Sequence, residues 1–127
     1  MVTLEGFREL YPKNEGWKLR VVFQPHLFSR TKLLLADFAK SFMEADDVLL
    51  LPIYYAREEN DGSISSEVLA DEININTHNS KAFKSFVDLE QFLEVGLPKM
   101  HEREVIITMG AGEAFKIGDF LLSNINL

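Results

Sequence analysis

Apolar residues along this chain follow two alternating patterns, short continuous runs and longer stretches in which they recur every three or four positions. The continuous runs predict four short strands, at residues 18–23, 48–54, 82–86 and 104–109. The spaced stretches predict helices before, between and after these strands, at residues 2–11, 31–45 and 65–73, between Asp88 and Gly96, and after Gly112. Strands therefore alternate with helices four times along the chain.

This alternation predicts a mostly parallel sheet with right-handed crossovers and helices on both faces. The run 48–54 is apolar throughout, as is typical of strands that are covered on both faces. The chain has 127 residues, enough to bury a real core, and shows no linker, low-complexity segment or further repeat. We therefore expect a single α/β domain over residues 1–127, a three-layer, doubly wound and mostly parallel sheet of the Rossmann-like kind.

Helix ends and core positions can be predicted as well. Ser29 or Thr31 is expected to cap the amino end of the helix that runs to Ala45, and Asp88 is expected to cap a later helix. Four phenylalanines at helical spacing are expected in the core, namely Phe38, Phe42, Phe92 and Phe120. The apolar face of the last helix is expected to hold Phe115, Phe120 and Leu121.

The charge balance restricts the class of partner. The chain carries 20 acidic and 13 basic residues and a net charge of −7, whereas nucleic acids and anionic membranes require a basic surface. Any anion site must therefore be a local cluster of basic residues on an acidic protein.

The absence of cysteine excludes disulfides, thiolate metal sites and thiol nucleophiles, and it fits the cytoplasm. The apolar run 48–53 is far too short to span a bilayer, and the chain opens without a signal-peptide pattern.

The stretch from Val21 to Thr31 is the strongest candidate for a site. It begins as an apolar run bounded by Pro25, which predicts a buried strand, and it ends in a polar turn that opens a helix. In parallel sheets ligands bind where strands end and helices begin, because free backbone N–H groups and a positive helix end converge there. The turn contains His26, which can donate, accept or titrate, and Arg30, a permanent planar cation. Their spacing lets both side chains converge on one anion.

The alternative for this pair is a hydrogen-bonded surface histidine and a solvated arginine. A zinc site is not expected, because the other histidines, His78 and His101, lie in different polar segments without ligand spacing. No serine lies in a G-x-S-x-G motif, so a nucleophile triad is not supported either. A phospho-acceptor domain would need acidic residues at the ends of its early strands, where this chain has glutamine, proline and tyrosine.

The segment after the second strand should reach the same rim. It contains Tyr55 and Arg57, which are therefore candidate rim contacts. The alternative for Arg57 is a solvated charge cluster with its neighbours Glu58 and Glu59.

A glycine turn, Gly110-Ala111-Gly112, lies between the last strand and the last helix, where a dinucleotide fingerprint would lie. Phe115 occupies the position of the third glycine, so a dinucleotide site is not expected. Gly110 and Gly112 either allow a tight turn or bring backbone N–H groups to a phosphate, and they are candidate rim contacts. No G-x-x-x-x-G-K-[ST] sequence occurs anywhere, so the chain contains no Walker-type cradle for ATP.

Taken together, these segments resemble a known family. The sequence Val22-Phe23-Gln24-Pro25-His26, followed by Ser29-Arg30-Thr31, resembles the segment that opens the third domain of the Mur ligases. It is most similar to the members that join L-alanine to UDP-N-acetylmuramate. The segments 53–58, with Gly62 after it, and 108–112 agree in order and spacing. The resemblance covers nearly all 127 residues and nothing beyond the carboxyl-terminal domain.

The resemblance implies a bacterial, cytoplasmic ligase of peptidoglycan precursor synthesis. In that reaction ATP phosphorylates the lactyl carboxylate of UDP-N-acetylmuramate, and the amine of L-alanine attacks the acyl phosphate to form an amide. A central domain would bind ATP and Mg²⁺, and an amino-terminal domain would bind the UDP sugar. The third domain would close over both. By this resemblance Arg30 pairs with the alanine carboxylate, and His26 is the catalytic residue that orients alanine or stabilises the tetrahedral intermediate.

Two features depart from the family pattern. Leu27 stands where many members have arginine, and a D-x-G-H-H-P segment that precedes the first helix in the family is absent. We therefore expect native sequence upstream of Met1 and no activity from this chain alone. One rival is a non-catalytic α/β module that binds a small anion or a protein partner through the same rim. Another is the related ligase that recycles a murein tripeptide, whose equivalent segment differs from Gln-Pro-His.

Overall fold

The structure is a computed structural model, and it describes residues 4–54, 59, 62–75, 77–96, 103–110 and 114–124. Helices and strands follow one another in this order: α1 (Leu4–Leu10), the 3-10 helix η1 (Lys13–Glu15), β1 (Lys18–Gln24), α2 (Phe28–Leu33), α3 (Leu35–Ser41), β2 (Asp47–Leu50), α4 (Ser66–Asn74), β3 (Ser80–Ala82), α5 (Phe86–Gly96), β4 (Glu104–Gly110) and α6 (Phe115–Asn124). None of the described helices is long and apolar enough to cross a membrane.

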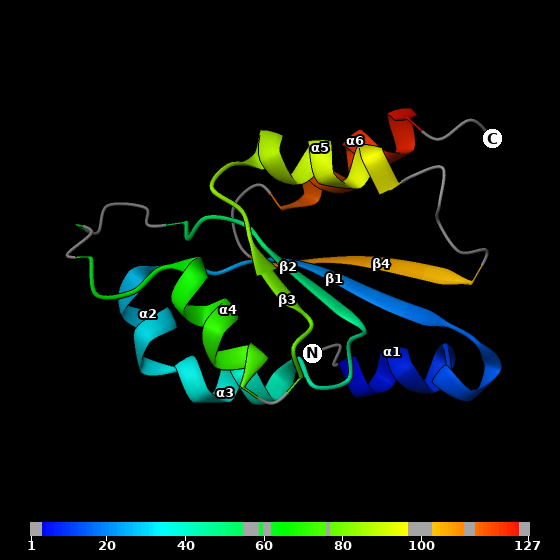
Figure 1. Cartoon of the computed structure of the whole chain (residues 1–127), viewed down its shortest axis with the longest axis horizontal. Coiled ribbons are helices and arrows are strands. Elements are labelled where there is room, and N and C mark those ends of the chain that lie inside the picture. The colour runs from blue at the N-terminus through cyan, green and yellow to red at the C-terminus, as the bar shows by residue number, and fades with distance from the viewer. Residues whose placement is uncertain are drawn as a thin grey trace.

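The strands form one parallel sheet in the order β3-β2-β1-β4 (Figure 1). Strand β1 is central, because Val22 lies opposite Leu49 of β2 on one side and opposite Thr108 of β4 on the other. Strand β2 pairs in turn with β3. Every connection between these parallel strands is a crossover, as the helices between them require. The predicted parallel α/β sheet is confirmed.

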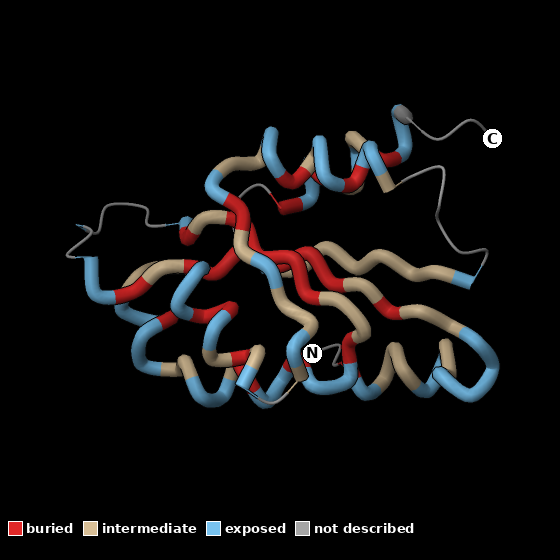
Figure 2. The backbone as a smooth tube through the Cα atoms, viewed as in Figure 1, coloured by how far each residue is buried: buried red, intermediate tan, exposed pale blue. Residues whose placement is uncertain are grey.

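Helices cover both faces of the sheet, because successive residues of a strand point to opposite sides. Val21 packs in one cluster with Leu69 of α4, whereas its neighbour Val22 packs in a second cluster with Leu89 of α5 and Ile117 of α6. Figure 1 shows α5 and α6 above the sheet and α1, α3 and α4 below it. Figure 2 shows buried positions gathered on the strands and on the helix faces between these layers. The predicted three-layer arrangement is confirmed.

The predicted ends of the strands differ from the observed ones. Strand β2 ends at Leu50, four residues before its predicted end at 54. Strand β4 ends one residue later than expected, and so does β1. Strand β3 lies at Ser80–Ala82, two residues before the predicted start, because helix α5 already begins at Phe86. The Ser85 hydroxyl accepts a hydrogen bond from the Asp88 amide (3.1 Å), so Ser85 provides the cap. The prediction that Asp88 caps this helix is wrong.

The predicted helix over 31–45 is instead two shorter helices, α2 and α3, and it begins three residues earlier. Leu27 is the N-cap residue of α2 and makes no side-chain capping bond. Thr31 is fully buried, and its hydroxyl donates to the Leu27 carbonyl one turn back (2.8 Å). Ser29 lies inside the helix. The prediction that Ser29 or Thr31 caps this helix is therefore wrong.

The aromatic core was predicted in part. Phe42 is buried, and the Phe23 ring packs on it at a centroid distance of 5.1 Å. Phe38 and Phe120 are partly buried against the two clusters. Phe92 is 39% exposed and carries the Lys81 ammonium over its ring, and Phe115 is 59% exposed. The core prediction is wrong for Phe92, and Phe115 of the predicted apolar face is exposed, because helical spacing marks a face without saying how far the partner layer extends.

An ion-pair cluster holds α1 to the amino edge of the sheet. The Arg8 guanidinium lies 2.9 Å from Asp46 Oδ2 and also donates to the Glu44 carbonyl, and Asp46 Oδ2 accepts from the Leu19 amide at 2.7 Å. Partial burial by itself raises the pKa of Asp46. The Leu19 amide and the Arg8 guanidinium outweigh this, so the pKa of Asp46 lies below its ordinary value of 3.8.

Asp46→Asn is expected to lower the free energy of unfolding by about 1 kcal/mol at pH 7, because it removes two partly exposed ionic contacts, with Arg8 at 2.9 Å and with Lys13 at 3.9 Å. A carboxyl whose pKa is lower in the folded state adds stability above its unfolded pKa and loses it as the pH falls through the folded pKa. Urea unfolding followed by circular dichroism should therefore show a constant difference from the unmodified chain near neutrality, and a shrinking one below about pH 4. Asp119→Asn on the exposed side of α6 controls for the loss of one charge. A difference that persists unchanged at about pH 3 would contradict this account.

Candidate functional site

The sheet has two points where neighbouring strands lead to helices on opposite faces, one between β1 and β4 and one between β2 and β3. The chain leaves β1 into α2 on the lower face, and it leaves β4 into α6 on the upper face (Figure 1). Strands β1 and β4 are adjacent, so their carboxyl ends lie side by side. In open parallel sheets ligands bind at the carboxyl ends of strands that diverge in this way. His26 follows the end of β1, and the glycine turn follows the end of β4.

Gly110 lies at the carboxyl end of β4, directly against β1. It pairs with Gln24 at the end of the sheet and has a φ of +112°. A Cβ atom on Gly110 would lie 2.2 Å from the Gln24 carbonyl oxygen. Gln24 is itself buried, and its side-chain amide donates to the Pro52 carbonyl (3.2 Å). The positive φ and this close approach require glycine at position 110, and the turn after it, at 111–113, lies outside the described residues.

The backbone around His26 is joined to the end of the next strand. His26 and Tyr54 form an isolated parallel bridge beyond the ends of β1 and β2. The Tyr54 amide donates to the Pro25 carbonyl (2.8 Å), and the Leu27 amide donates to the Tyr54 carbonyl (2.7 Å). The imidazole also stacks on the Tyr54 ring, with centroids 5.6 Å apart and an angle of 18° between the planes. Backbone and ring contacts thus hold His26 at the rim.

Leu27 turns the chain from the strand into helix α2. Its φ of +66° is uncommon for a residue other than glycine and marks local strain. Its amide donates a hydrogen bond to the Tyr54 carbonyl. Its own carbonyl accepts hydrogen bonds from the Thr31 amide (3.1 Å) and the Thr31 hydroxyl (2.8 Å). Bonds on both sides therefore hold the strained residue, which separates the two candidate side chains.

Arg30 lies in the first turn of α2 and is exposed, while His26 is partly buried. The two side chains thus belong to the same turn of chain at the carboxyl edge, and neither is sealed in the interior. Among the described residues, no carboxylate lies within ion-pair distance of the Arg30 guanidinium. This part of the sequence prediction, a histidine and a cation at one lip of the sheet, agrees with the structure.

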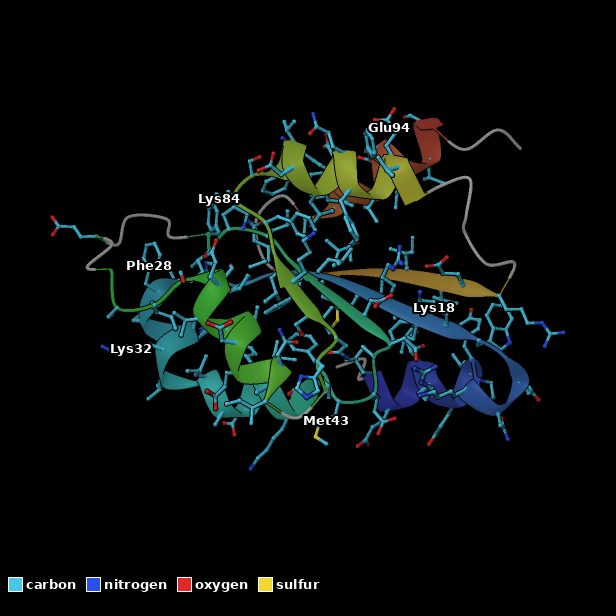
Figure 3. The ribbon with its side chains drawn as sticks, in the orientation of Figure 1. Lys18, Phe28, Lys32, Met43, Lys84 and Glu94 are labelled. Atoms are coloured by element: carbon cyan, nitrogen blue, oxygen red, sulfur yellow. The ribbon has the colours of Figure 1, made fainter. Side chains whose placement is uncertain are left out.

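Further cations lie at the same edge. Lys32 of α2 donates to the Ser63 hydroxyl (3.3 Å), and Lys84 follows β3. Figure 3 shows Phe28, Lys32 and Lys84 at the end of the molecule where the strands point. A hollow of about 300 Å³ lies there, lined in part by Phe28, Ser66 and Lys84. Two larger hollows, between α1 and α3 and between α5 and the sheet, lie away from His26 and Arg30.

The structure does not describe three of the other predicted site residues. Tyr55, Arg57 and Gly112 lie outside the described residues, so they remain predictions. Tyr54 was not predicted as a site residue, although it is the residue that contacts His26. The available signal was its place at the end of the second apolar run, which a parallel sheet puts beside the end of the first.

Known proteins share extensive sequence similarity with this chain. No protein-family model matches the chain. It is 41% identical over 121 residues to the UDP-N-acetylmuramate–L-alanine ligase of Clostridium acetobutylicum, which covers 95% of the chain and 25% of the relative. The ligase of Clostridium novyi is 43% identical over 101 residues, covering 80% of the chain and 21% of the relative.

The chain is thus similar to about a quarter of each of two ligases that carry this name. A third relative with the same name, from Acetivibrio thermocellus, is 36% identical over 107 residues, or 84% of the chain. The chain spans about a quarter of the length of the curated relatives it matches. The predicted resemblance to the Mur ligases is confirmed.

Proposed function

We propose that this chain is the carboxyl-terminal domain of a UDP-N-acetylmuramate–L-alanine ligase, and that it binds the amino acid and closes the active site. The observation that carries the proposal is the similarity of 95% of the chain to one quarter of a ligase with that name. The carboxyl edge of the sheet has suitable chemistry, because an exposed arginine and a partly buried histidine lie on one turn there. The enzyme acts in the bacterial cytoplasm.

The roles of the two side chains follow from the chemistry of L-alanine. Arg30 binds the carboxylate, since a guanidinium donates two parallel hydrogen bonds to a carboxylate. Such a charged contact contributes about 1.5–3 kcal/mol where water is excluded. His26 then orients the amine, or donates to the oxygen of the tetrahedral intermediate as the amine attacks the activated carboxyl of UDP-N-acetylmuramate. Tyr55, Arg57, Gly110 and Gly112 are candidate contacts along the same rim.

ATP and Mg²⁺ are assigned to the part of the enzyme outside this chain. The sequence contains no G-x-x-x-x-G-K-[ST] loop to hold a triphosphate. Within the residues that the structure describes, no three His, Asp or Glu side chains gather as metal ligands. The described residues therefore offer no nucleotide–magnesium site, and the proposal gives this domain the amino acid as its ligand.

A hybrid enzyme tests the proposal. In the Clostridium acetobutylicum ligase, the matched quarter is replaced by this chain, and amide product is measured with ATP, L-alanine and UDP-N-acetylmuramate. The hybrid is expected to form product, and the 127-residue chain alone is expected to form none. Circular dichroism and gel filtration establish that the hybrid is folded. A folded hybrid that forms no product at saturating L-alanine would remove the proposal.

A further inference from the structure

We infer that Tyr54 is a positioning residue for the reaction, which holds the His26 imidazole in its working orientation. The inference rests on the proposed role of His26 in amide formation. Tyr54 is not assigned a contact with substrate or cofactor, and it acts through the His26 imidazole beside it. Two independent observations carry the inference, one from the rings and one from the backbone.

The ring contact is geometrically defined. The imidazole and the phenol are nearly parallel, with an interplanar angle of 18° and centroids 5.6 Å apart. Offset stacking of this kind restricts rotation of the smaller ring about its own side-chain bonds. Tyr54 is 42% exposed and is not a member of either core cluster. Its ring therefore packs on the imidazole at the rim and contributes little to the core.

The backbone contacts fix the two residues in register independently of the ring. The Tyr54 amide and carbonyl both bond to the segment that contains His26, at 2.8 Å and 2.7 Å. The second of these bonds holds the strained Leu27, which has a φ of +66° and precedes the turn that contains Arg30. A side-chain substitution at Tyr54 leaves both backbone bonds possible. The positioning of the imidazole can therefore be removed while the strand ends remain joined.

Two variants of the hybrid ligase test the inference. Tyr54→Leu is expected to lower kcat roughly three- to tenfold, because an imidazole that samples several orientations is less often in the reactive one. The KM for ATP should not change. Tyr54→Phe keeps the ring and should restore kcat. Tyr11→Leu is the matched control, since it removes an aromatic pair with Trp17 at the opposite edge of the sheet and should leave kcat unchanged.

A spectroscopic measurement on the 127-residue chain separates this inference from the proposed function. The face of the Tyr54 ring lies against the imidazole, so ring currents should displace the proton resonances of His26. Tyr54→Leu should remove that displacement, and Tyr54→Phe should keep it. A hybrid that forms no product with Tyr54 intact refutes the proposed function, while the resonances still test the stacking. Unchanged kcat and unchanged His26 resonances in Tyr54→Leu would overturn the inference, and so would a Tyr54→Phe variant as impaired as Tyr54→Leu.

Discussion

Gly110→Ala is expected to lower the free energy of unfolding by about 3 kcal/mol or more. Two physical effects add at this position. The φ of +112° is strained for any residue that has a Cβ atom, and the new Cβ would lie 2.2 Å from the carbonyl oxygen of Gln24. The clash involves backbone atoms that pair at the end of β1 and β4, so it can be relieved only by separating the strand ends.

The matched control is Gly118→Ala in the interior of α6. Nothing lies within 4 Å of the position that its Cβ would occupy, and helix propensity favours alanine over glycine by about 1 kcal/mol. Chemical denaturation of both variants should therefore show changes of opposite sign. A Gly110→Ala chain as stable as the unmodified one would show that the two strand ends are not in close contact.

The second large effect is expected for Arg30→Ala in the hybrid ligase. Loss of a charged contact of about 1.5–3 kcal/mol should raise the KM for L-alanine roughly 10- to 150-fold and lower kcat as well. Stability should be nearly unchanged, because Arg30 is exposed in a short helix and no described carboxylate pairs with it. The KM for ATP should not change, since the proposal assigns the nucleotide to the part of the enzyme outside this chain.

Two further variants sharpen this experiment. Arg30→Lys keeps the charge but loses the planar fork, so it should recover only part of the affinity for L-alanine. Lys13→Ala removes one positive charge from a side chain that is 79% exposed at the amino edge of the sheet, and its kinetics should match those of the unmodified hybrid. If Arg30→Ala leaves the KM for L-alanine unchanged, Arg30 does not belong to the site.

Much of the fold could be predicted from local pattern. The apolar runs of β1 and β4 are strong signals because both strands lie between two covering layers. The predicted position of strand β3 is too late in the sequence. Ala82, Phe83 and Phe86 form one apolar run, but the strand ends at Ala82 and Phe86 already belongs to helix α5. The start of α2 was missed since Leu27 is not a capping residue type. Its place as N-cap depends on hydrogen bonds to Tyr54 and Thr31 that local pattern does not contain.

The sequence by itself determined the alternation of strands and helices, and with it the placing of His26 and Arg30 at the carboxyl edge. That much follows because parallel strands end on one side of their sheet. Only the tertiary structure decided which strand ends meet. It brought Tyr54 onto the imidazole and Gly110 onto the Gln24 carbonyl. Both contacts depend on strand order and register, which are set by the packing of distant segments against one another and not by the residues on either side.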